Sequence, residues 1–388
     1  MGIWSMRHIH FSVCGIGLGH ASRCKPLILE SIRRGVRVTV STYGDAVDYF
    51  ERYGISVLRV PGLDYGRTDR GEVSIKATLL KNLFLPLKVM AQTLIEAQII
   101  EESEADAILA DTRASAVLAS RITGVPSILI INQYNVILQK DRLPGLSSFF
   151  EDFINSFTIA WSLSDSLLIA DYPPPLTISR DNLVMRDKDE RRVEYIGPML
   201  EKIPSDYQSR AKIKERMGLD PSLPLVAIIP TGPRPDRARF IEIITPLLLH
   251  LKDLQIIMTG VRGGLGVSRG DDRLRLVEWY DDEYELLGAA DVVVTRAGQT
   301  LTAKALAFKC RLVLIPIPRQ TEQESNAKSL TQNRVAVTLK EGEVSAESLK
   351  QAIKNALDRI DDSDLQRYSR FVANVKPVER VLELLLRR

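Results

Sequence analysis

The sequence predicts two α/β domains, each built around a parallel β-sheet. Short apolar, β-branched runs alternate with longer helical patterns in the first half of the chain, and a second series of such runs begins at Leu225. This alternation is typical of βαβ units, which form parallel sheets. A length of 388 residues and a hydrophobic content of 45% are sufficient for two buried cores.

The apolar runs define the strands that we expect in each domain. In the first domain they occupy residues 8–13, 37–41, 56–60, 107–110, 127–131 and 166–170. In the second domain they begin at Leu225 and continue with residues 255–259, 274–278, 292–295 and 312–315. Prolines on both sides of Gly218 separate the two series and are typical stop signals.

These signals predict the domain boundaries. We expect an N-terminal domain over residues 1–197, a hinge over residues 198–222 and a C-terminal domain over residues 223–370. In residues 371–388, apolar side chains recur at helical spacing after Pro377. This pattern predicts a C-terminal helix that packs on the protein, with the N-terminal domain as the candidate partner.

The composition argues against several classes of protein. The net charge of +3 comes from mixed signs, so no nucleic-acid partner is expected. The three cysteines form no CxxC pair and the four histidines show no metal-ligand spacing, which argues against structural zinc and a disulfide framework. No run approaches the roughly 18 to 20 apolar residues of a spanning helix, and no secretory signal pattern is evident. We therefore expect a cytoplasmic protein.

A glycine-rich turn follows the first expected strand. Gly15, Gly17 and Gly19 stand at alternate positions before a helical pattern, so the chain is able to turn tightly and bring backbone N–H groups close to a ligand. The spacing is GxGxG, not the GxGxxG of a dinucleotide site, and no acidic residue ends the second strand. These two differences disfavour NAD binding.

His20 follows this turn and is the candidate catalytic base. Asp111 ends a later strand of the same expected sheet, where its carboxylate is able to accept a hydrogen bond from the imidazole Nδ1–H and make Nε2 a better base. Two alternatives remain: His20 as a packed or helix-capping residue, and Asp111 as the cap of the next helix.

The C-terminal half carries a candidate anion site. Gly298 and Thr300 open an expected helix directly after a strand. A glycine and a hydroxyl at a helix N-terminus bind an anion without lysine or metal. A diphosphate would fit this position.

At this point the chain resembles the MurG-like and UDP-glycosyltransferase families. The ordered motifs that carry the resemblance are Trp279, 285–291, 296–298, Thr300, 304–306, Pro316, Glu322-Gln323 and Asn326-Ala327. The resemblance covers residues 225–330 well and extends loosely to the GIGLGHASR run and to Asp111. It implies the GT-B fold, in which two Rossmann-like domains face a central cleft.

The resemblance also implies an inverting, metal-independent glycosyltransferase whose only small-molecule requirement is its substrate nucleotide sugar. A UDP-linked donor is preferred, and the sugar is a hexose or an N-acetylhexosamine such as N-acetylglucosamine. The implied donor contacts lie in five places: the base loop of Glu278, Trp279 and Tyr280; the phosphate turn of Thr231 and Gly232 with Arg234; Gly298 and Thr300; Lys304; and Glu322 with Gln323 for sugar hydroxyls.

One position departs from the family pattern. Lys304 stands where these families have a glutamate that contacts the ribose diol, and lysine donates hydrogen bonds but accepts none. Either the nucleotide sits differently, another group binds the ribose, or the donor carries an extra anion near this point.

The acceptor is suggested by residues 75–94, which combine large apolar side chains with three lysines and no acidic residue. Such a stretch is able to lie in a membrane interface, or to cover the acceptor site. A glycolipid or polyprenyl-linked acceptor at the inner face of the cell membrane is the leading interpretation. Two alternatives share the fold: a non-catalytic nucleotide-sugar-binding subunit, and a nucleotide-sugar 2-epimerase, whose first loop carries a different pattern.

Overall fold

The structure is a computed structural model that describes residues 7–62, 85–135, 137, 155, 157–185, 187–261 and 273–387. The chain forms two compact units. Unit 1 comprises the described residues of Met1–Pro173, Ser179–Glu201 and Val375–Arg388, and unit 2 those of Pro174–Ile178 and Lys202–Asn374.

Unit 1 contains a parallel sheet whose strand order is β3-β2-β1-β4-β5-β6-β7. Its strands are β1 (His8–Val13), β2 (Arg37–Thr42), β3 (Leu58–Arg59), β4 (Ala107–Asp111), β5 (Ser127–Ile131), β6 (Ser166–Ile169) and β7 (Val193–Tyr195). Every residue of β1, β4 and β5 is buried, because helices cover both faces of the central strands.

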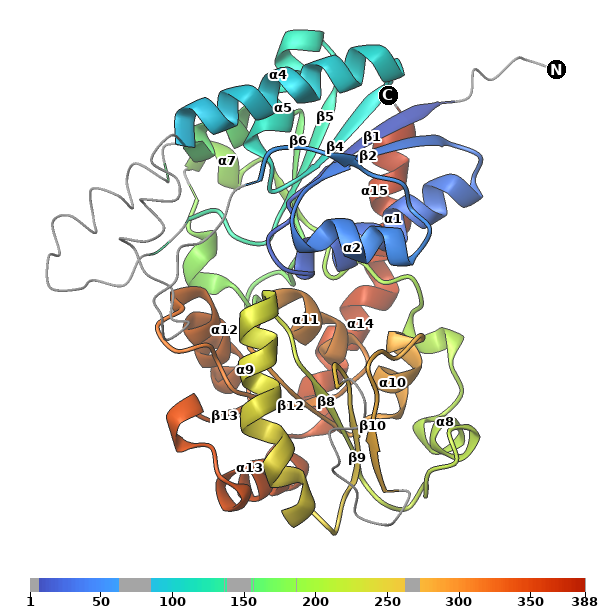
Figure 1. Cartoon of the computed structure of the whole chain (residues 1–388), viewed down its shortest axis with the longest axis vertical. Helices are drawn as coiled ribbons and strands as arrows, with labels where there is room; N and C mark the ends of the chain where they lie inside the picture. The colour runs from blue at the N-terminus through green and yellow to red at the C-terminus, as the bar shows by residue number, and fades with distance from the viewer. Residues whose placement is uncertain are drawn as a thin grey trace, which may run out of the picture. The chain divides into compact units, whose positions relative to one another are not determined.

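The helices of unit 1 form two layers. Figure 1 shows α4 and α5 on one side of the sheet and α1, α2 and α15 on the other. The main helices are α1 (Gly19–Arg33), α2 (Asp45–Arg52), α4 (Leu85–Ser103), α5 (Ala114–Thr123) and α15 (Pro377–Leu386). The core between α4, α5 and the sheet includes Ile100, Ile108, Val117 and Leu129.

Unit 2 contains a second parallel sheet, with the strand order β10-β9-β8-β11-β12-β13. Its strands are β8 (Leu225–Ile229), β9 (Gln255–Met258), β10 (Leu274–Leu276), β11 (Val292–Thr295), β12 (Arg311–Leu314) and β13 (Ala336–Thr338). Its helices are α8 (Arg210–Arg216), α9 (Arg234–Ile244), α10 (Glu283–Ala289), α11 (Gln299–Ala307), α12 (Thr321–Gln332), α13 (Ala346–Arg359) and most of α14 (Asp362–Val375).

These two sheets confirm the predicted fold class. All the strands expected from apolar runs are present, with ends shifted by at most a few residues. The sequence did not indicate β7 or β13, which are three residues each and lie at the edges of their sheets. Edge strands this short carry too little apolar pattern to be recognised.

The segment expected to be a hinge, 198–222, is structured. The division between the units falls after Glu201, and α8 belongs to unit 2, where Ile213 is buried and Lys214 pairs with Asp291 at 2.6 Å. The C-terminal helix α15 returns to unit 1 and packs against α1. Across the part of the chain that the structure describes, no helix is long and apolar enough to cross a membrane.

In each sheet, the strand order reverses direction at the first strand of the unit. β1 lies between β2 and β4, and β8 lies between β9 and β11. The loops that follow β1 and β4, or β8 and β11, therefore begin side by side and leave in opposite directions. Open α/β sheets bind ligands at such a switch point, outside the carboxyl ends of the strands.

Candidate active site

The glycine turn at the end of β1 is held against the end of β2. A Cβ atom at Gly15 would lie 1.7 Å from the backbone oxygen of Tyr43, so only glycine fits there. Gly17 has a φ of 68°, which glycine adopts without strain. Helix α1 begins at Gly19 and places His20 in its first turn.

His20 contacts Asp111 at the switch point of unit 1. The imidazole Nδ1 lies 2.7 Å from Oδ1 of Asp111, and the histidine side chain keeps 18% of its surface exposed while the aspartate has none. Asp111 is the last residue of β4 and α5 is capped at Arg113, so the carboxylate serves the histidine and not the helix. The structure therefore brings the two predicted catalytic residues into contact.

Two residues of α1 complete the surroundings of Asp111. Arg23 donates from Nε to Oδ2 at 2.7 Å and from Nη2 to Oδ1 at 2.5 Å, and the Cys24 thiol donates to Oδ2 at 3.1 Å. The two-point Arg23 contact has the geometry of a strong charge-assisted pair. Arg23 was not singled out from the sequence, although its position three residues after His20 puts both on one helix face.

The proton on His20 is assigned from these contacts. Nη2 of Arg23 also lies 2.7 Å from Nδ1, but the guanidinium only donates, whereas the Asp111 carboxylate at the same distance accepts an Nδ1–H in a charge-assisted bond. We therefore assign the Nδ1 proton to the bond with Asp111, which leaves the lone pair on Nε2.

Charge interactions keep Asp111 ionised and make His20 more basic. Burial raises the pKa of Asp111, but the Arg23 guanidinium and then His20 lower it well below the usual range, so the group is a carboxylate. Burial lowers the pKa of His20, but the Cys14 thiolate and then Asp111 raise it overall. Burial raises the pKa of Cys14, whereas the charge of His20 lowers it. His20 is thus a stronger base than free histidine.

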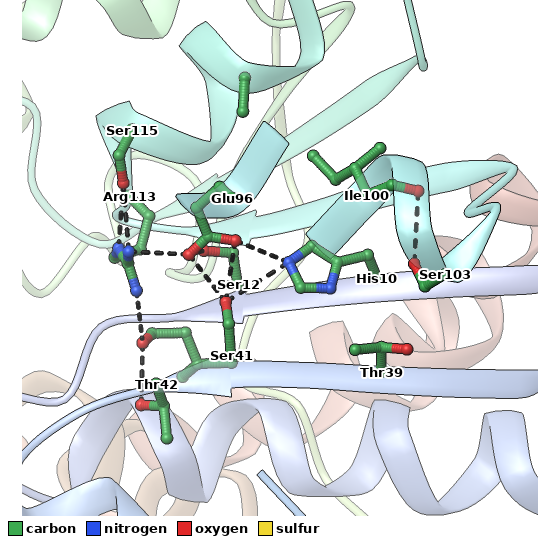
Figure 2. Close-up of polar contacts among 12 residues, drawn as sticks. His10, Ser12, Thr39, Ser41, Thr42, Glu96, Ile100, Ser103, Arg113 and Ser115 are labelled. Atoms are coloured by element: carbon green, nitrogen blue, oxygen red, sulfur yellow. Dashed lines mark hydrogen bonds and ion pairs between the residues drawn. The ribbon is translucent and has the colours of Figure 1, made fainter. Parts of the chain in front are cut away.

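A second buried ion pair lies on the α4 side of the sheet. Figure 2 shows the carboxylate of Glu96 between Arg113 and His10, with the hydroxyls of Ser12 and Ser41 directed at it. Arg113 Nη2 donates to Oε1 at 2.8 Å, and His10 Nε2 lies 2.7 Å from Oε2. Ser12 and Ser41 donate to Oε1 at 2.9 and 2.8 Å. Glu96 comes from α4 and is fully buried, and no motif in the sequence pointed to it.

A single turn connects this pair to the predicted catalytic residues His20 and Asp111. Thr112 lies between Asp111 and Arg113 and has a φ of 54°, which is strained for a β-branched residue. Asp111 is thus anchored to α1 through Arg23, and Arg113 to α4 through Glu96. The two ion pairs hold the turn that presents Asp111 to His20.

The switch point of unit 2 brings together two of the predicted phosphate-binding segments. Thr231 follows β8, and a Cβ atom at Gly298, after β11, would lie 3.9 Å from its hydroxyl oxygen. Gly232 has a φ of 99°, and Arg234 begins α9 with an exposed side chain. Gly298 caps α11, and Thr300 is half-buried in its first turn.

The remaining predicted donor residues lie on neighbouring loops of unit 2. Glu278 is exposed and Trp279 and Tyr280 are half-buried, in the loop after β10. Glu322 is half-buried at the start of α12, whereas Gln323 is buried and accepts a hydrogen bond from the Ile317 N–H at 3.0 Å.

Lys304 occupies the same helix as Thr300, one turn later. Its side chain is 1% exposed, and Nζ lies 3.2 Å from Oε1 of Glu283. The residues that the structure describes contain no group of three or more histidine, cysteine, aspartate or glutamate side chains arranged to hold a metal ion.

Comparisons with known proteins agree with this architecture. Residues 264–377 match the glycosyltransferase family 28 C-terminal domain, and residues 7–147 match glycosyl transferase family 1. An "uncharacterized glycosyltransferase" of Methanosarcina acetivorans is 24% identical over 376 residues, covering 96% of each protein.

A shorter match is closer in sequence. Over 78 residues, 20% of each chain, the protein is 49% identical to the UDP-N-acetylglucosamine--N-acetylmuramyl-(pentapeptide) pyrophosphoryl-undecaprenol N-acetylglucosamine transferase of Bacillus subtilis.

Solved structures share the fold across the whole chain. MurG of Acinetobacter baumannii matches with a TM-score of 0.60 and 16% identity, covering 98% of this chain and 100% of that one. CalG4, the calicheamicin glycosyltransferase, matches with a TM-score of 0.65 and 15% identity, covering 99% of each. The family matches and the full-length relative support a glycosyltransferase, and the solved structures show that its fold is of the GT-B type. Residues 264–377 match the family 28 C-terminal domain, and the resemblance to the MurG-like group is confirmed.

Proposed function

We propose that the protein is an inverting, metal-independent transferase that moves N-acetylglucosamine or a related sugar from a UDP-sugar to an acceptor hydroxyl. The observation that carries this proposal is the contact between His20 and Asp111 at the switch point of unit 1. A buried carboxylate that fixes the tautomer of a partly exposed histidine is an arrangement suited to a general base.

The proposed reaction is a single displacement. The acceptor hydroxyl oxygen attacks the anomeric carbon, its proton passes to Nε2 of His20, and the bond from the anomeric carbon to the diphosphate oxygen breaks. One displacement inverts the anomeric configuration. The departing UDP carries the electron pair of the broken bond.

Unit 2 supports the donor side of the proposal. The start of α11, at Gly298 and Thr300, and the turn at Thr231 and Gly232 offer backbone N–H groups and hydroxyls where negative charge would develop. Fixed donors of this kind stabilise a leaving diphosphate without a metal ion. The match to the Bacillus subtilis enzyme favours UDP-N-acetylglucosamine as the donor.

Helix α4 supports a lipid-linked acceptor. The first half of this helix exposes apolar side chains and buries polar ones. Leu87, Met90 and Leu94 are 56%, 55% and 60% exposed, whereas Gln92 and Thr93 are buried. An outward apolar stripe at helical spacing favours contact with an acyl or polyprenyl chain at a membrane surface. The earlier part of the predicted membrane stretch, residues 75–84, lies outside the described residues.

The experiment is a transfer assay with two readouts. The protein is incubated with UDP-N-acetylglucosamine and a polyprenyl diphosphate-linked sugar in EDTA, and UDP release and the product's anomeric configuration are measured. The proposal expects UDP release that EDTA leaves unchanged, and a β-linked product from the α-linked donor. Loss of turnover in EDTA would contradict the metal-free mechanism. An α-linked product would contradict the single displacement. A nucleotide-linked sugar epimerised at C2, formed without transfer to the acceptor, would replace the transferase proposal with the epimerase alternative.

A further inference from the structure

A buried lysine in the last turn of α11 and a partly exposed glutamate at the start of α10 form an ion pair. Lys304 Nζ lies 3.2 and 3.4 Å from the two carboxylate oxygens of Glu283 and 5.4 Å from the ring centre of Tyr284. The lysine side chain is 1% exposed, whereas the glutamate side chain is 32% exposed. The lysine is thus enclosed, and the glutamate faces both the lysine and solvent.

This pair differs from the other carboxylates of the same helix turn. Asp282 caps α10 and is bonded to Lys202 at 2.5 Å and to the Tyr207 hydroxyl at 2.9 Å. Glu285 is paired with Arg216 at 2.6 Å. Those two acids have evident structural partners at the surface of unit 2. Glu283 is held from its buried side by Lys304, and a carboxylate retains further lone pairs for a ligand.

The position of Glu283 matches the middle of a nucleotide. It follows the loop of residues 278–280 by three residues, and Lys304 lies about 6 Å along α11 from Thr300, because a helix rises about 1.5 Å per residue. In a nucleoside diphosphate, the ribose separates the base from the phosphates. A base at residues 278–280 and phosphates at the start of α11 would therefore place the ribose near Glu283.

We propose that Glu283 binds the ribose of the donor by accepting hydrogen bonds from its 2′- and 3′-hydroxyls, and that Lys304 is the positioning residue that fixes this carboxylate. Acidic side chains recognise ribose hydroxyls in other open α/β nucleotide sites by the same chemistry. The inference rests on the proposed use of a UDP-sugar in unit 2. It makes the protein selective for ribonucleotides over 2′-deoxyribonucleotides.

Calorimetric titration of the full chain with UDP and with 2′-deoxy-UDP tests this inference. We expect the unaltered protein to bind UDP at least about tenfold more tightly, since a hydrogen bond to a charged group is lost with the 2′-hydroxyl. In Glu283→Gln, we expect UDP affinity to fall about tenfold and 2′-deoxy-UDP affinity to fall less, because only its contact through the 3′-hydroxyl is weakened. The preference for ribose should then nearly disappear.

Two further variants separate ligand binding from structural support. Glu283→Gln combined with Lys304→Met removes the ion pair without leaving an unpaired buried ammonium, and should show the same loss of preference in a protein of near-normal melting temperature. The matched control, Glu285→Gln, removes a carboxylate from the same helix turn and should keep the preference.

The outcomes are distinct. If the unaltered protein binds UDP but Glu283→Gln and the double variant retain its preference for ribose, Glu283 does not bind the ribose and the inference is overturned. If UDP and UDP-sugars do not bind the unaltered protein, the proposed donor is wrong and the inference falls with it.

Discussion

The imidazole Nδ1 of His20 lies 2.7 Å from Oδ1 of Asp111, although the two residues are 91 positions apart in the sequence. Parallel pairing of β1 with β4 creates this contact, because Val13 is aligned with Asp111 and the chain turns into α1 directly after β1. The strand register therefore sets the geometry of the His20–Asp111 contact, and Arg23 holds the carboxylate in place.

We expect Asp111→Asn to reduce kcat by about one to two orders of magnitude, less than the loss of His20 itself. The amide disturbs the tautomer and orientation of the imidazole but leaves the base present. The double variant with His20→Ala should be hardly slower than His20→Ala alone, since residues that act as a unit are not additive. Additive losses in a double-mutant cycle would contradict the dyad. Melting temperatures must be measured in parallel, because Arg23 loses its charged partner.

We expect the turnover number to rise with pH through a range above 6.5, the ordinary pKa of histidine. His20 must be unprotonated to accept a proton, and although burial lowers its pKa, Cys14 and Asp111 raise it overall. Below this pKa, kcat should rise about tenfold per pH unit. Cys14→Ala and Asp111→Asn each remove a cause of the shift, so the rise should move to lower pH. A rise centred at or below 6.5, unmoved in both variants, would contradict the assignment.

We expect the ion pair between Glu96 and Arg113 to stabilise the folded protein as well as to support turnover. Glu96→Gln leaves the buried Arg113 without its charged partner, so the free energy of unfolding should fall by about 3 to 5 kcal/mol at neutral pH. Burial raises the pKa of Glu96, but Arg113 and His10 lower it to about 2 from 4.5. The stability that this carboxylate contributes is therefore present above pH 4.5 and is lost as the pH falls toward 2.

Urea unfolding at several pH values checks this prediction. Ser12→Ala is the control, because it removes one hydrogen bond to Glu96 and keeps the ion pair. We expect it to lower the free energy of unfolding by about 1 kcal/mol. If Glu96→Gln is no more destabilising than Ser12→Ala, the ion pair does not hold the turn. Glu96→Gln combined with Arg113→Met should recover part of the stability, since no buried charge remains.

The apolar stripe on α4 predicts binding to membranes. Replacing Leu87, Met90 and Leu94 by serine should reduce sedimentation with phosphatidylglycerol vesicles at least about tenfold, since apolar surface would no longer enter the interface. UDP affinity should stay the same. Ile122→Ser on α5 is the control, because Ile122 is also 60% exposed but stands outside the stripe. An equal loss in both variants would argue against a specific docking face.

The fold and the dyad could be predicted from the sequence because both depend on local patterns. Apolar runs marked the strands, and His20 and Asp111 each follow or end a strand of the same sheet, where parallel topology brings strand ends together. The reading of Asp111 as a helix cap is not what the structure shows, since its carboxylate bonds His20 and Arg23 instead.

The partners of the charged residues could not be predicted. Glu96 is 17 positions from Arg113 and meets it because α4 packs against α5, whose N-cap is Arg113. No local sequence pattern indicates this packing. Lys304 was recognised as unusual, but its pairing with Glu283 depends on how α10 lies against α11. Buried ion pairs between elements are set by tertiary packing, which the sequence of either element does not contain.

The central claim is that His20 is the base of a glycosyl transfer. Its most direct test is the single-turnover rate of His20→Ala with saturating UDP-sugar on an acceptor that the unaltered protein uses. We expect the rate to fall by about two to four orders of magnitude while UDP affinity changes less than about twofold, because the proposed nucleotide site lies in unit 2. A His20→Ala protein with a near-normal transfer rate on that acceptor would contradict the claim.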